Sequence, residues 1–514
     1  MRRLRVARPA ANRGRRRPTR AGRALRLHTA GIVPRMSIGL MHLVVPCLLA
    51  TAAFAQAPAA AAPAAPAEPA AAAVAIAPIA PSELRARREA VAQAVAKQAD
   101  GKTAVVLVRG AGKQADMGAF VQLQDFLYLA GVPEPDLAVL LVVGPDGALL
   151  RDELLVPPFS RFAATWDGDF LAPGETAAKR TGFATAGNVR SLHRQLDELL
   201  AADAAGARPA LFTLAQPAAR TGSTPRKAAD GAREMQQDRF DGRRSREESL
   251  VQALRTAHDG LRIEALEPIV HALRAHKSAA EIAILRRCSQ LTATGHAEAM
   301  RACAPGVGES HLAAVARFAF SLQGAGPDAY GAIVGGGPNG CILHYNALTR
   351  TLRDDDLIVM DYAPTLHGYA VDVTRTFPAS GKFSPAQRQL VQDVHDVQQA
   401  LIREVKPGAS LTKIGALCAK LLTERGYKND HGPCHHVGLA VHDPNPDVLQ
   451  PGMVITVEPG AYLRDVGMGC RIEDTILVTA DGCEVLSAGV PSTPDAIEAL
   501  MAQPGLLQAA NGMK

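Results

Sequence analysis

Two aspartates occupy strand-like, otherwise apolar stretches where an ionisable side chain is costly. Asp361 lies in LIVMDYA and Asp372 in YAVDVTRTF, with a turn-like segment at 364–368 between them. If these stretches form an antiparallel hairpin in which Ala363 faces Ala370, the two aspartates lie directly opposite each other, with Cβ atoms about 4.5–5.5 Å apart. Two carboxylates at so short a distance, surrounded by hydrophobic side chains, repel each other unless one is protonated or a cation lies between them. The pair therefore predicts a metal site.

Three further ionisable residues lie in apolar or glycine-rich strand sequence: His435 in HHVGLAVH, Glu458 in VITVEPG and Glu473 in CRIEDTILV. With the two aspartates they provide four carboxylates and one imidazole, enough negative charge to neutralise two divalent ions. An oxygen-rich set of this kind favours manganese, cobalt or zinc, and two ions about 3.5–4 Å apart would share bridging carboxylates. We therefore predict a dinuclear centre, with manganese as the first choice.

The chain resembles the Xaa-Pro aminopeptidase (aminopeptidase P) group of the pita-bread metallopeptidases over roughly residues 82–495. In the N-terminal half, 120–136 resembles the group's non-catalytic domain and 268–287 its interdomain segment. The matching stretches of the C-terminal half are LHYN at 343–346, MDYAPTLHGYAVDVTRTFPASGKFSPAQ at 360–387, HGPCHHVGLAVHD at 431–443, VEPGAYL at 457–463 and RIED at 471–474. The resemblance implies a C-terminal pita-bread catalytic domain preceded by a smaller α/β domain.

The resemblance also implies roles for individual residues. A metal-bridging hydroxide would attack the scissile carbonyl, and Glu458 would ligate one ion and pass the proton to the leaving nitrogen. His344 and His442 match histidines that contact the substrate and stabilise the tetrahedral intermediate, and His431 matches one on the leaving-group side. The implied metal ligands are Asp361, Asp372, His435, Glu458 and Glu473.

Three neighbouring residues need separate interpretation. Arg471 lies two residues before Glu473, so it projects to the same side of its strand, where it could hold a ligand carboxylate; the alternative is a surface ion pair. Tyr462 matches a site residue of the family, although a core position is an equal alternative. His436 should point away from the metals, because the HxxGLxxH register selects His435.

The elements that must position these residues fall into two domains. In residues 82–265, apolar runs at 103–108, 137–144 and 210–215 alternate with helix-like segments, which is typical of an α/β domain. The polar segment 219–247 has almost no large apolar side chains, so we expect a surface loop or disordered insertion there. Residues 270–495 combine two helices with several hairpin strands and predict an α+β catalytic domain, followed by a tail at 496–514.

Capping boxes mark the two helices of this second domain. Ser278 and Glu281 open the first helix, which should stop at Pro305-Gly306, and Ser384 and Gln387 open the second.

The first 81 residues suggest export. Residues 38–54 run apolar without a formal charge and end at a small-x-small cleavage pattern near Ala55, so 1–55 is interpreted as an Arg-rich extension with a signal peptide, and 56–81 as an Ala/Pro-rich linker. A cleaved signal is favoured over a retained anchor, which leaves a periplasmic or secreted protein with no stable membrane partner. Cys47 leaves with the signal, and the seven remaining cysteines are expected to be mostly buried, with one disulfide at most.

The charge distribution argues against a nucleic-acid partner. Residues 1–35 carry twelve Arg and no acid, so the net charge of +6 becomes 6 − 12 = −6 for the remainder.

The leading hypothesis is an exported dinuclear metallo-aminopeptidase that removes the first residue of peptides with Pro second. The alternatives are a prolidase restricted to Xaa-Pro dipeptides, which would need a cation for the substrate carboxylate, and a catalytically inactive pita-bread module that binds peptides. Retention of all five ligands counts against the inactive module and against a creatinase-like hydrolase that needs no metal. The resemblance further implies a homo-oligomer.

Overall fold

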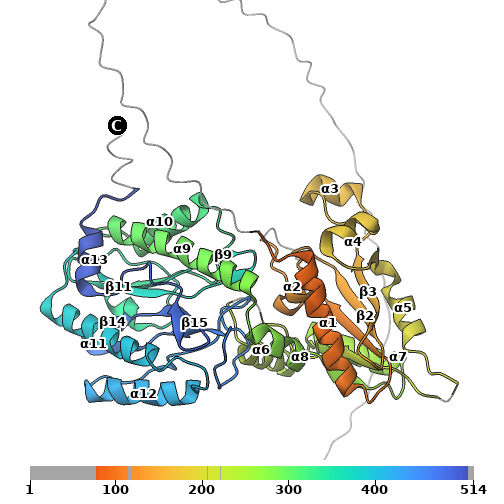
Figure 1. Ribbon diagram of the computed structural model, residues 1–514. Helices are drawn as coiled ribbons and strands as arrows, with labels where there is room; N and C mark the ends of the chain where they lie inside the picture. Colours follow the sequence, from red (N-terminus) through yellow and green to blue (C-terminus); the bar gives the residue numbers. More distant parts are fainter. Residues whose placement is uncertain (1–76, 114–118, 205, 220–221, 507–514) are drawn as a thin grey trace, which may run out of the picture. The chain divides into compact units, whose positions relative to one another are not determined.

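The computed structural model describes residues 77–113, 119–204, 206–219 and 222–506 (Figure 1). The predicted signal peptide and most of the Ala/Pro-rich linker lie outside these residues. The described residues all belong to one compact unit. None of the described helices has both the length and the apolar character needed to cross a membrane.

The N-terminal domain is built on a mixed six-stranded sheet of strand order β4-β3-β2-β1-β5-β6. Strands β1, β2 and β3 pair antiparallel, whereas β4, β5 and β6 each join a neighbour in parallel. The elements are α1 (Pro81–Gln98), β1 (Ala104–Arg109), α2 (Gln124–Ala130), β2 (Ala138–Val143), β3 (Leu149–Val156), α3 (Arg161–Asp167), α4 (Glu175–Thr181), β4 (Thr185–Asn188), α5 (Leu192–Leu199), β5 (Ala210–Thr213), α6 (Pro225–Gln237), α7 (Arg246–Ala257) and β6 (Ile263–Ala265).

Both faces of this sheet are covered, which explains why its central strands are apolar without alternation. Val106 and Val108 of β1 pack in one cluster with α1 and α2, whereas Val105 and Leu107 pack in another with α5 and α7. Successive side chains of a strand point to opposite faces, so every position of β1 meets a helix layer. The predicted α/β domain is therefore a sheet between two layers of helices.

The expectation of an irregular loop across 219–247 needs correction, because α6 occupies Pro225–Gln237 and α7 begins at Arg246. Thr224 caps α6 through a hydrogen bond that its side chain accepts from the Lys227 amide, with Pro225 at the first helical position. Only Ala232 of this helix is buried. Local propensity and capping are enough to form α6 without the apolar stripe that the prediction required.

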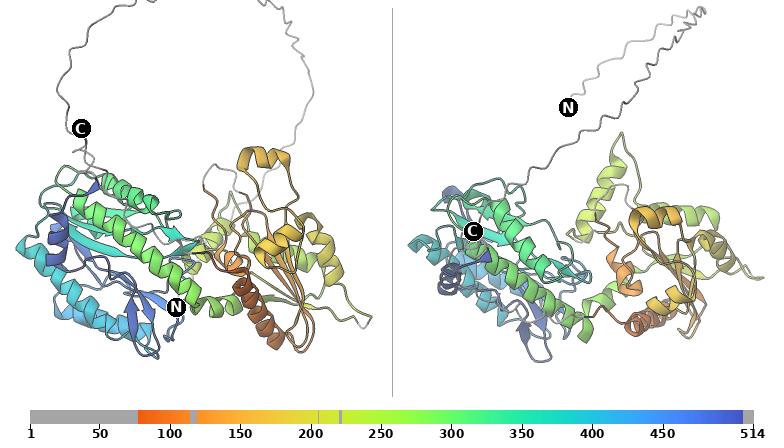
Figure 2. Two further views of the ribbon diagram at one scale, coloured as in Figure 1. Left: turned by 45° about the horizontal axis from the view of Figure 1, so that its top comes forward. Right: turned by 90° about the horizontal axis from the view of Figure 1, so that it is seen from above.

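The catalytic domain begins with helices and ends with helix α13, with paired strands between them (Figures 1 and 2). The capping boxes of α9 and α11 are both present, as predicted. The elements are α8 (Glu267–Ala275), α9 (Ala279–Ala302), α10 (Glu309–Leu322), β7 (Ile333–Gly336), β8 (Leu357–Asp361), β9 (Thr365–Leu366), β10 (Tyr369–Ala370), β11 (Thr374–Pro378), α11 (Pro385–Ile402), α12 (Leu411–Glu424), β12 (Val454–Val457), β13 (Gly460–Leu463), β14 (Met468–Arg471), β15 (Asp474–Val478), β16 (Cys483–Val485) and α13 (Pro494–Met501).

Helices α9, α10 and α11 enclose one large core with β7, β8 and β11, and α12 packs with β12 and β15 in a second. The expected domain boundary at 495 cuts through α13, whose Ile497 is 1% exposed within the first of these cores. The catalytic domain therefore continues through Met501, because an amphipathic last helix completes its core. Its seven cysteines are all unpaired, and Cys288, Cys341, Cys418 and Cys470 are buried.

Candidate metal centre and substrate pocket

The hairpin that carries the two aspartates has a register two residues from the one predicted. Thr365 pairs with Ala370 and, farther along the ladder, Asp361 faces Thr374 instead of Asp372. The shift is even, so Asp361 and Asp372 still project from one face, as diagonal neighbours. The predicted direct opposition is wrong, but the predicted shared face is confirmed.

Glu458 and Glu473 lie opposite each other between two strand pairs, β12 with β15 and β13 with β14. The pairings Val457↔Asp474 and Gly460↔Arg471 flank this position in the same register. An isolated bridge also joins Glu473 to Thr374 and connects this ladder to the hairpin. Neither glutamate belongs to a regular strand, and both point into the space beside the aspartates.

His435 reaches the carboxylates from a segment that runs beside β12. The Thr456 amide donates to the His435 carbonyl at 2.8 Å, which fixes the backbone. The ring lies with Nδ1 3.1 Å from the carbonyl of His436, so Nδ1 carries the proton and donates it there. The unprotonated Nε2 then faces Glu458 at 3.3 Å and Asp372 at 3.6 Å. This is the tautomer of a metal ligand.

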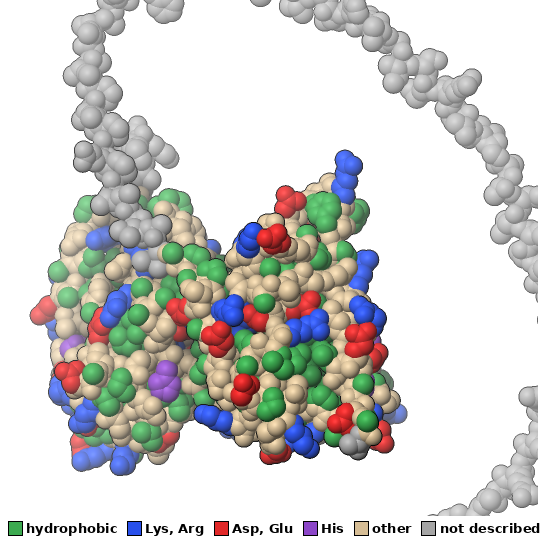
Figure 3. All heavy atoms as spheres, turned by 45° about the vertical axis from the view of Figure 1, so that its right-hand side comes forward, with side chains coloured by type: hydrophobic (Ala, Val, Ile, Leu, Met, Phe, Trp, Pro, Cys, Tyr) green, Lys and Arg blue, Asp and Glu red, His purple; other side chains and the backbone are tan. Residues whose placement is uncertain are grey.

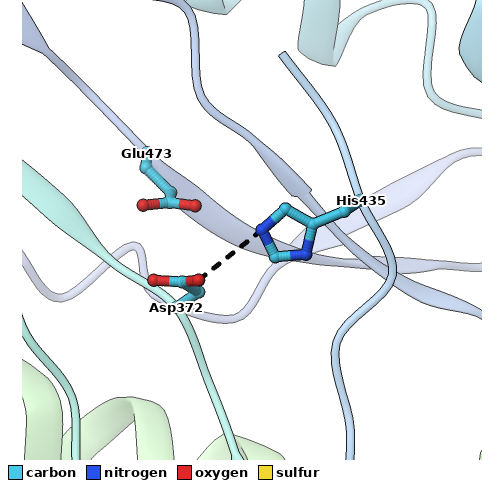
Figure 4. Close-up of side chains that lie close together, drawn as sticks. All are labelled: Asp372, His435 and Glu473. Atoms are coloured by element: carbon cyan, nitrogen blue, oxygen red, sulfur yellow. Dashed lines mark ion pairs between the residues drawn. The ribbon is translucent and has the colours of Figure 1, made fainter. Parts of the chain in front are cut away.

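Figure 4 shows Asp372, His435 and Glu473 pointing toward one another. One ligand atom from each of these three lies within 4.8 Å of the others. Burial, followed by the neighbouring carboxylates, raises the pKa of Asp372 and of Glu473 well above the usual range. Burial also raises the pKa of Glu458, although Arg471 opposes the shift.

These residues fit divalent metal ions. Oδ1 of Asp361 is buried and has no hydrogen-bond partner in the described part of the chain, so a good acceptor faces the cluster unused. Three buried carboxylates and the half-buried Glu458 beside an unprotonated imidazole nitrogen are stable as anions only with added positive charge, and two divalent ions would supply it. The ligands would be Asp361, Asp372, His435, Glu458 and Glu473.

Side chains behind the carboxylates fix their orientation. Arg471 donates to Asp361 Oδ2 at 2.8 Å and to the Tyr462 hydroxyl at 3.0 Å. The Tyr330 hydroxyl donates to Asp372 at 2.6 Å, and the Thr374 hydroxyl donates to Glu473 at 2.7 Å. Arg471 therefore holds a predicted ligand, as the alternate spacing before Glu473 suggested.

Sequence reasoning missed Tyr330 and Thr374. Thr374 carried a usable signal, because it lies two residues after Asp372 and so shares its face; Tyr330 carried none, because its contact depends on how β7 approaches the hairpin.

The cluster opens into a cavity of about 470 Å³. His344, His431 and His442 line it, as do Asn346 and Cys434. Burial, followed by the neighbouring imidazole of His435, lowers the pKa of His442 to about 3, and burial followed by Arg471 lowers that of His431 to about 4. The three histidines therefore face the cavity as neutral hydrogen-bonding groups at neutral pH.

The two residues with open interpretations are also placed. The Tyr462 hydroxyl lies 3.0 Å from Nε2 of His431 and thus at the edge of the site. His436 is fully buried and its Nε2 lies 3.1 Å from the Pro446 carbonyl, away from the carboxylates, as predicted.

Comparisons with known proteins agree with this arrangement. Residues 283–480 match the model of metallopeptidase family M24, and residues 84–206 match that of the aminopeptidase P N-terminal domain. The chain is 40% identical to Xaa-Pro aminopeptidase of Escherichia coli over 268 residues, which are 46% of this chain and 61% of the relative. It is 32% identical to the mitochondrial intermediate cleaving peptidase 55 of Arabidopsis thaliana, over 47% of this chain and 54% of that one. The aligned part thus spans less than two thirds of each of these relatives.

The structural match extends further along the chain. E. coli aminopeptidase P, solved with the inhibitor Pro-Leu, superimposes with a TM-score of 0.67 at 29% identity, covering 83% of this chain and 99% of that one. An aminopeptidase P-like structure from Bacillus anthracis has a TM-score of 0.72 at 24% identity, which speaks for the fold alone. Residues 283–480 therefore form a domain of the metallopeptidase M24 type, and the chain has the pita-bread fold of aminopeptidase P with its N-terminal domain.

Proposed function

We propose that this protein is a dinuclear Xaa-Pro aminopeptidase, which hydrolyses the bond between the first residue of a peptide and a following proline. The observation that carries the proposal is the convergence of Asp361, Asp372, His435, Glu458 and Glu473 at the base of a cavity lined by three neutral histidines. Two divalent ions in this site, manganese by preference, would lower the pKa of a water molecule toward neutrality and polarise the scissile carbonyl.

The chain's own residues would orient the substrate and move the proton. Glu458 lines the cavity 3.7 Å from His431, where its ionised carboxylate would take a proton from the attacking water and deliver it to the proline nitrogen. His344 and His442 can donate hydrogen bonds to the oxygen that becomes negative in the transition state. Arg471 holds the Asp361 carboxylate in place through its hydrogen bond to Oδ2.

Proline as the second residue explains why such a site would be specialised. Its amide nitrogen has no hydrogen, so a peptidase that binds through that donor cannot use the peptide.

The test is hydrolysis of Ala-Pro-Ala and of Ala-Pro by protein starting at Gln56, after chelation and again after addition of manganese. We expect manganese to restore release of the first alanine from the tripeptide, and Asp372→Ala to lower kcat by more than about 100-fold with unchanged circular dichroism. Cleavage of the dipeptide alone would assign a prolidase instead. A folded protein that binds two metals and cleaves neither would overturn the proposal.

We also propose export and self-association. Export is supported by the apolar segment 38–54 and its cleavage pattern, and would be tested by mass spectrometry of the mature N-terminus, expected at Gln56. Self-association is supported by the exposed aromatic side chains of Phe159, Phe162 and Trp166, which are 65%, 75% and 73% exposed. A monomer in light scattering at micromolar concentration would contradict it.

A further inference from the structure

Two exposed glycines line the substrate cavity, and they come from different domains. Gly222 lies in the segment of the N-terminal domain that leads into α6, and Gly432 follows His431 in the catalytic domain. Neither glycine has a backbone φ in the left-handed region, so residues with a side chain fit the backbone at both positions. The backbone conformation therefore does not explain why both residues are glycine.

Both positions also have room for a side chain. A Cβ atom on Gly222 would lie 3.4 Å from the Cβ atom and 3.8 Å from the Cα atom of Tyr330, which are ordinary van der Waals distances. A Cβ atom on Gly432 would have no atom of the described residues within 4 Å. A side chain at either position would therefore take up space that is now open at the edge of the cavity.

Gly222 lies next to one end of the metal-ligand cluster. It faces Tyr330, which also lines the cavity and whose hydroxyl donates to Asp372 at 2.6 Å. Asp372 lies 3.6 Å from His435, and Figure 4 shows these two side chains pointing toward each other. The side chain of Tyr330 thus connects Gly222 to the carboxylate of Asp372.

Gly432 lies next to the other end of the cluster. Glu458 lies 3.3 Å from His435 and 3.7 Å from His431, and Nδ1 of His431 lies 3.0 Å from the Gly432 carbonyl. In the proposed reaction Glu458 delivers the proton to the proline nitrogen, and His431 is on the leaving-group side. The part of the substrate that begins with proline therefore extends toward Gly432.

The first residue of the substrate then lies toward Gly222. The peptide runs in opposite directions from the two sides of the cleaved bond, so this residue lies on the side of Asp372 and Tyr330. Its ammonium group is favoured beside carboxylates. Because position 222 has no side chain, this side of the cavity leaves space for the side chain of a large first residue.

We infer that Gly222 sets the size of the first residue that the enzyme accepts, whereas Gly432 sets the size of the residue after the proline. This inference rests on the proposed aminopeptidase function. It names the substrate class as peptides in which a large first residue, such as leucine, precedes proline. The N-terminal domain takes part in substrate selection through the segment before α6.

The test uses manganese-loaded enzyme and the ratio of kcat/KM for Leu-Pro-Ala to that for Gly-Pro-Ala, because this ratio does not depend on the fraction of folded protein. For Gly222→Leu we expect the ratio to fall about tenfold, since the added side chain occupies the space of the substrate leucine. For Gly222→Ala it should fall about two- to threefold. The ratio of kcat/KM for Ala-Pro-Leu to that for Ala-Pro-Ala should change by less than about twofold in both variants.

Gly432→Leu should have the opposite pattern. We expect it to lower the ratio for Ala-Pro-Leu to Ala-Pro-Ala about tenfold and to change the ratio for Leu-Pro-Ala to Gly-Pro-Ala by less than about twofold. Gly231→Leu is the matched control, because Gly231 is exposed within α6 and a Cβ atom on it would have no described atom within 4 Å. It should change neither ratio by as much as about twofold.

An unchanged ratio of Leu-Pro-Ala to Gly-Pro-Ala in Gly222→Leu would overturn the inference while leaving the aminopeptidase function intact, and so would an exchange of the effects of Gly222→Leu and Gly432→Leu. Absence of wild-type turnover on all four peptides would instead overturn the proposed function. Calorimetry with the same uncleaved peptides would then test Gly222 separately. Equal affinity of wild-type protein and Gly222→Leu for Leu-Pro-Ala would overturn the inference as well.

Discussion

Single carboxylates determine what the metal centre can do. Asp372 and Glu473 are buried against each other and against Glu458, and without added positive charge their pKa values are raised, so they hold protons that a metal ion must displace. Metal affinity in this protein should therefore be tied to proton release, because ligands must be deprotonated before they bind.

Metal binding at pH 7 is thus expected to release at least one proton per protein. Titrating chelated protein with manganese in two buffers of different ionisation enthalpy measures that number as the slope of the observed enthalpy. Glu473→Gln removes one of the coupled acids, so both the proton count and the number of bound ions should fall. Binding with no buffer dependence would contradict the raised pKa values.

The ligand residues and one supporting partner, Arg471, could be predicted from the sequence, whereas the partners Thr374 and Tyr330 were not. An acidic side chain in an apolar strand is conspicuous, since its burial is costly without a partner, and this identified Asp361 and Asp372. The role of Thr374 depends on its position opposite Asp361, which the predicted register placed two residues away. Tyr330 approaches from a separate part of the chain, so no local pattern marks it.

At the scale of elements, one buried glutamate organises the loop that carries His344. Glu309, at the start of α10, is fully buried and accepts hydrogen bonds from the Gly336 amide, the Asn339 side chain, the Tyr345 hydroxyl and the Arg350 amide. Four donors converge on one carboxylate, so hydrogen bonds hold the segment between β7 and β8 against the N-terminal end of α10.

Replacement of this residue by Glu309→Gln should lower the free energy of unfolding by about 1–3 kcal/mol, because the amide nitrogen meets donors where an oxygen accepted them. The measurement is urea unfolding together with kcat/KM, which should fall as His344 loses its support. Glu404→Gln, at a 52% exposed side chain that lies 3.9 Å from Lys406, is the control and should change stability by less than about 0.5 kcal/mol. Equal effects of the two substitutions would contradict this role.

Helix α9 carries a buried histidine that makes stability depend on pH. His296 is fully buried, its Nε2 donates to the Tyr362 carbonyl at 2.9 Å, and burial lowers its pKa to about 4. Below about pH 6.5, His296 therefore binds a proton in the unfolded chain but stays neutral in the folded protein until the pH approaches 4. Its contribution to stability is present above pH 6.5 and is lost progressively as pH falls toward 4.

Between pH 7 and pH 4.5, the free energy of unfolding of the wild-type protein should fall by about 2–3 kcal/mol more than that of His296→Gln. The glutamine amide can still donate to the Tyr362 carbonyl. Urea unfolding of both chelated proteins at the two pH values isolates the difference, since the raised carboxylate pKa values act equally on both. Parallel pH dependence of the two proteins would show that the pKa of His296 is the same in the folded and the unfolded chain.

Elements were predictable where their ends carry local chemistry. The capping boxes at Ser278 and Ser384 need only residues within one turn, and both helices begin as predicted. The prediction of the hairpin register was wrong because a shift by two residues leaves the same side chains on the same face. Burial alone therefore does not distinguish the two registers. Helix α6 was missed for the opposite reason, because it buries almost nothing.

At the scale of the whole molecule, charge pairs matter according to their burial. Basic and acidic side chains are interspersed on the face drawn in Figure 3, and exposed pairs of this kind contribute little to stability. A different arrangement joins α2, α8 and the segment that carries two site histidines. Arg274 of α8 binds Asp125 of α2 and also Asp443, which accepts a second bond from Lys277 at 3.1 Å.

Asp443 is 4% exposed, and although burial opposes ionisation, Arg274 and Lys277 hold its pKa below the usual range. It directly follows His442, and its amide donates to the His436 carbonyl at 2.9 Å. Through Arg274, the N-terminal domain is therefore connected to the segment that presents His435 and His442 to the cavity. This domain should thus contribute to activity without touching the metals.

Asp443→Asn leaves two buried cations with a neutral partner, so we expect the free energy of unfolding to fall by about 3–5 kcal/mol. Asp125→Asn weakens only the contacts of α2 with Arg274 and His271, and it should cost less stability yet lower kcat/KM, because Asp443 keeps both of its cations while Arg274 loses its ionic contact with the N-terminal domain. Urea unfolding and kinetics on the same samples separate the two effects. Glu484→Gln, which breaks the exposed pair with Arg286, is the control and should change neither by a measurable amount. If Asp125→Asn left kcat/KM unchanged, the contact between the two domains would not affect activity, and the position of His442 would be set within the catalytic domain alone.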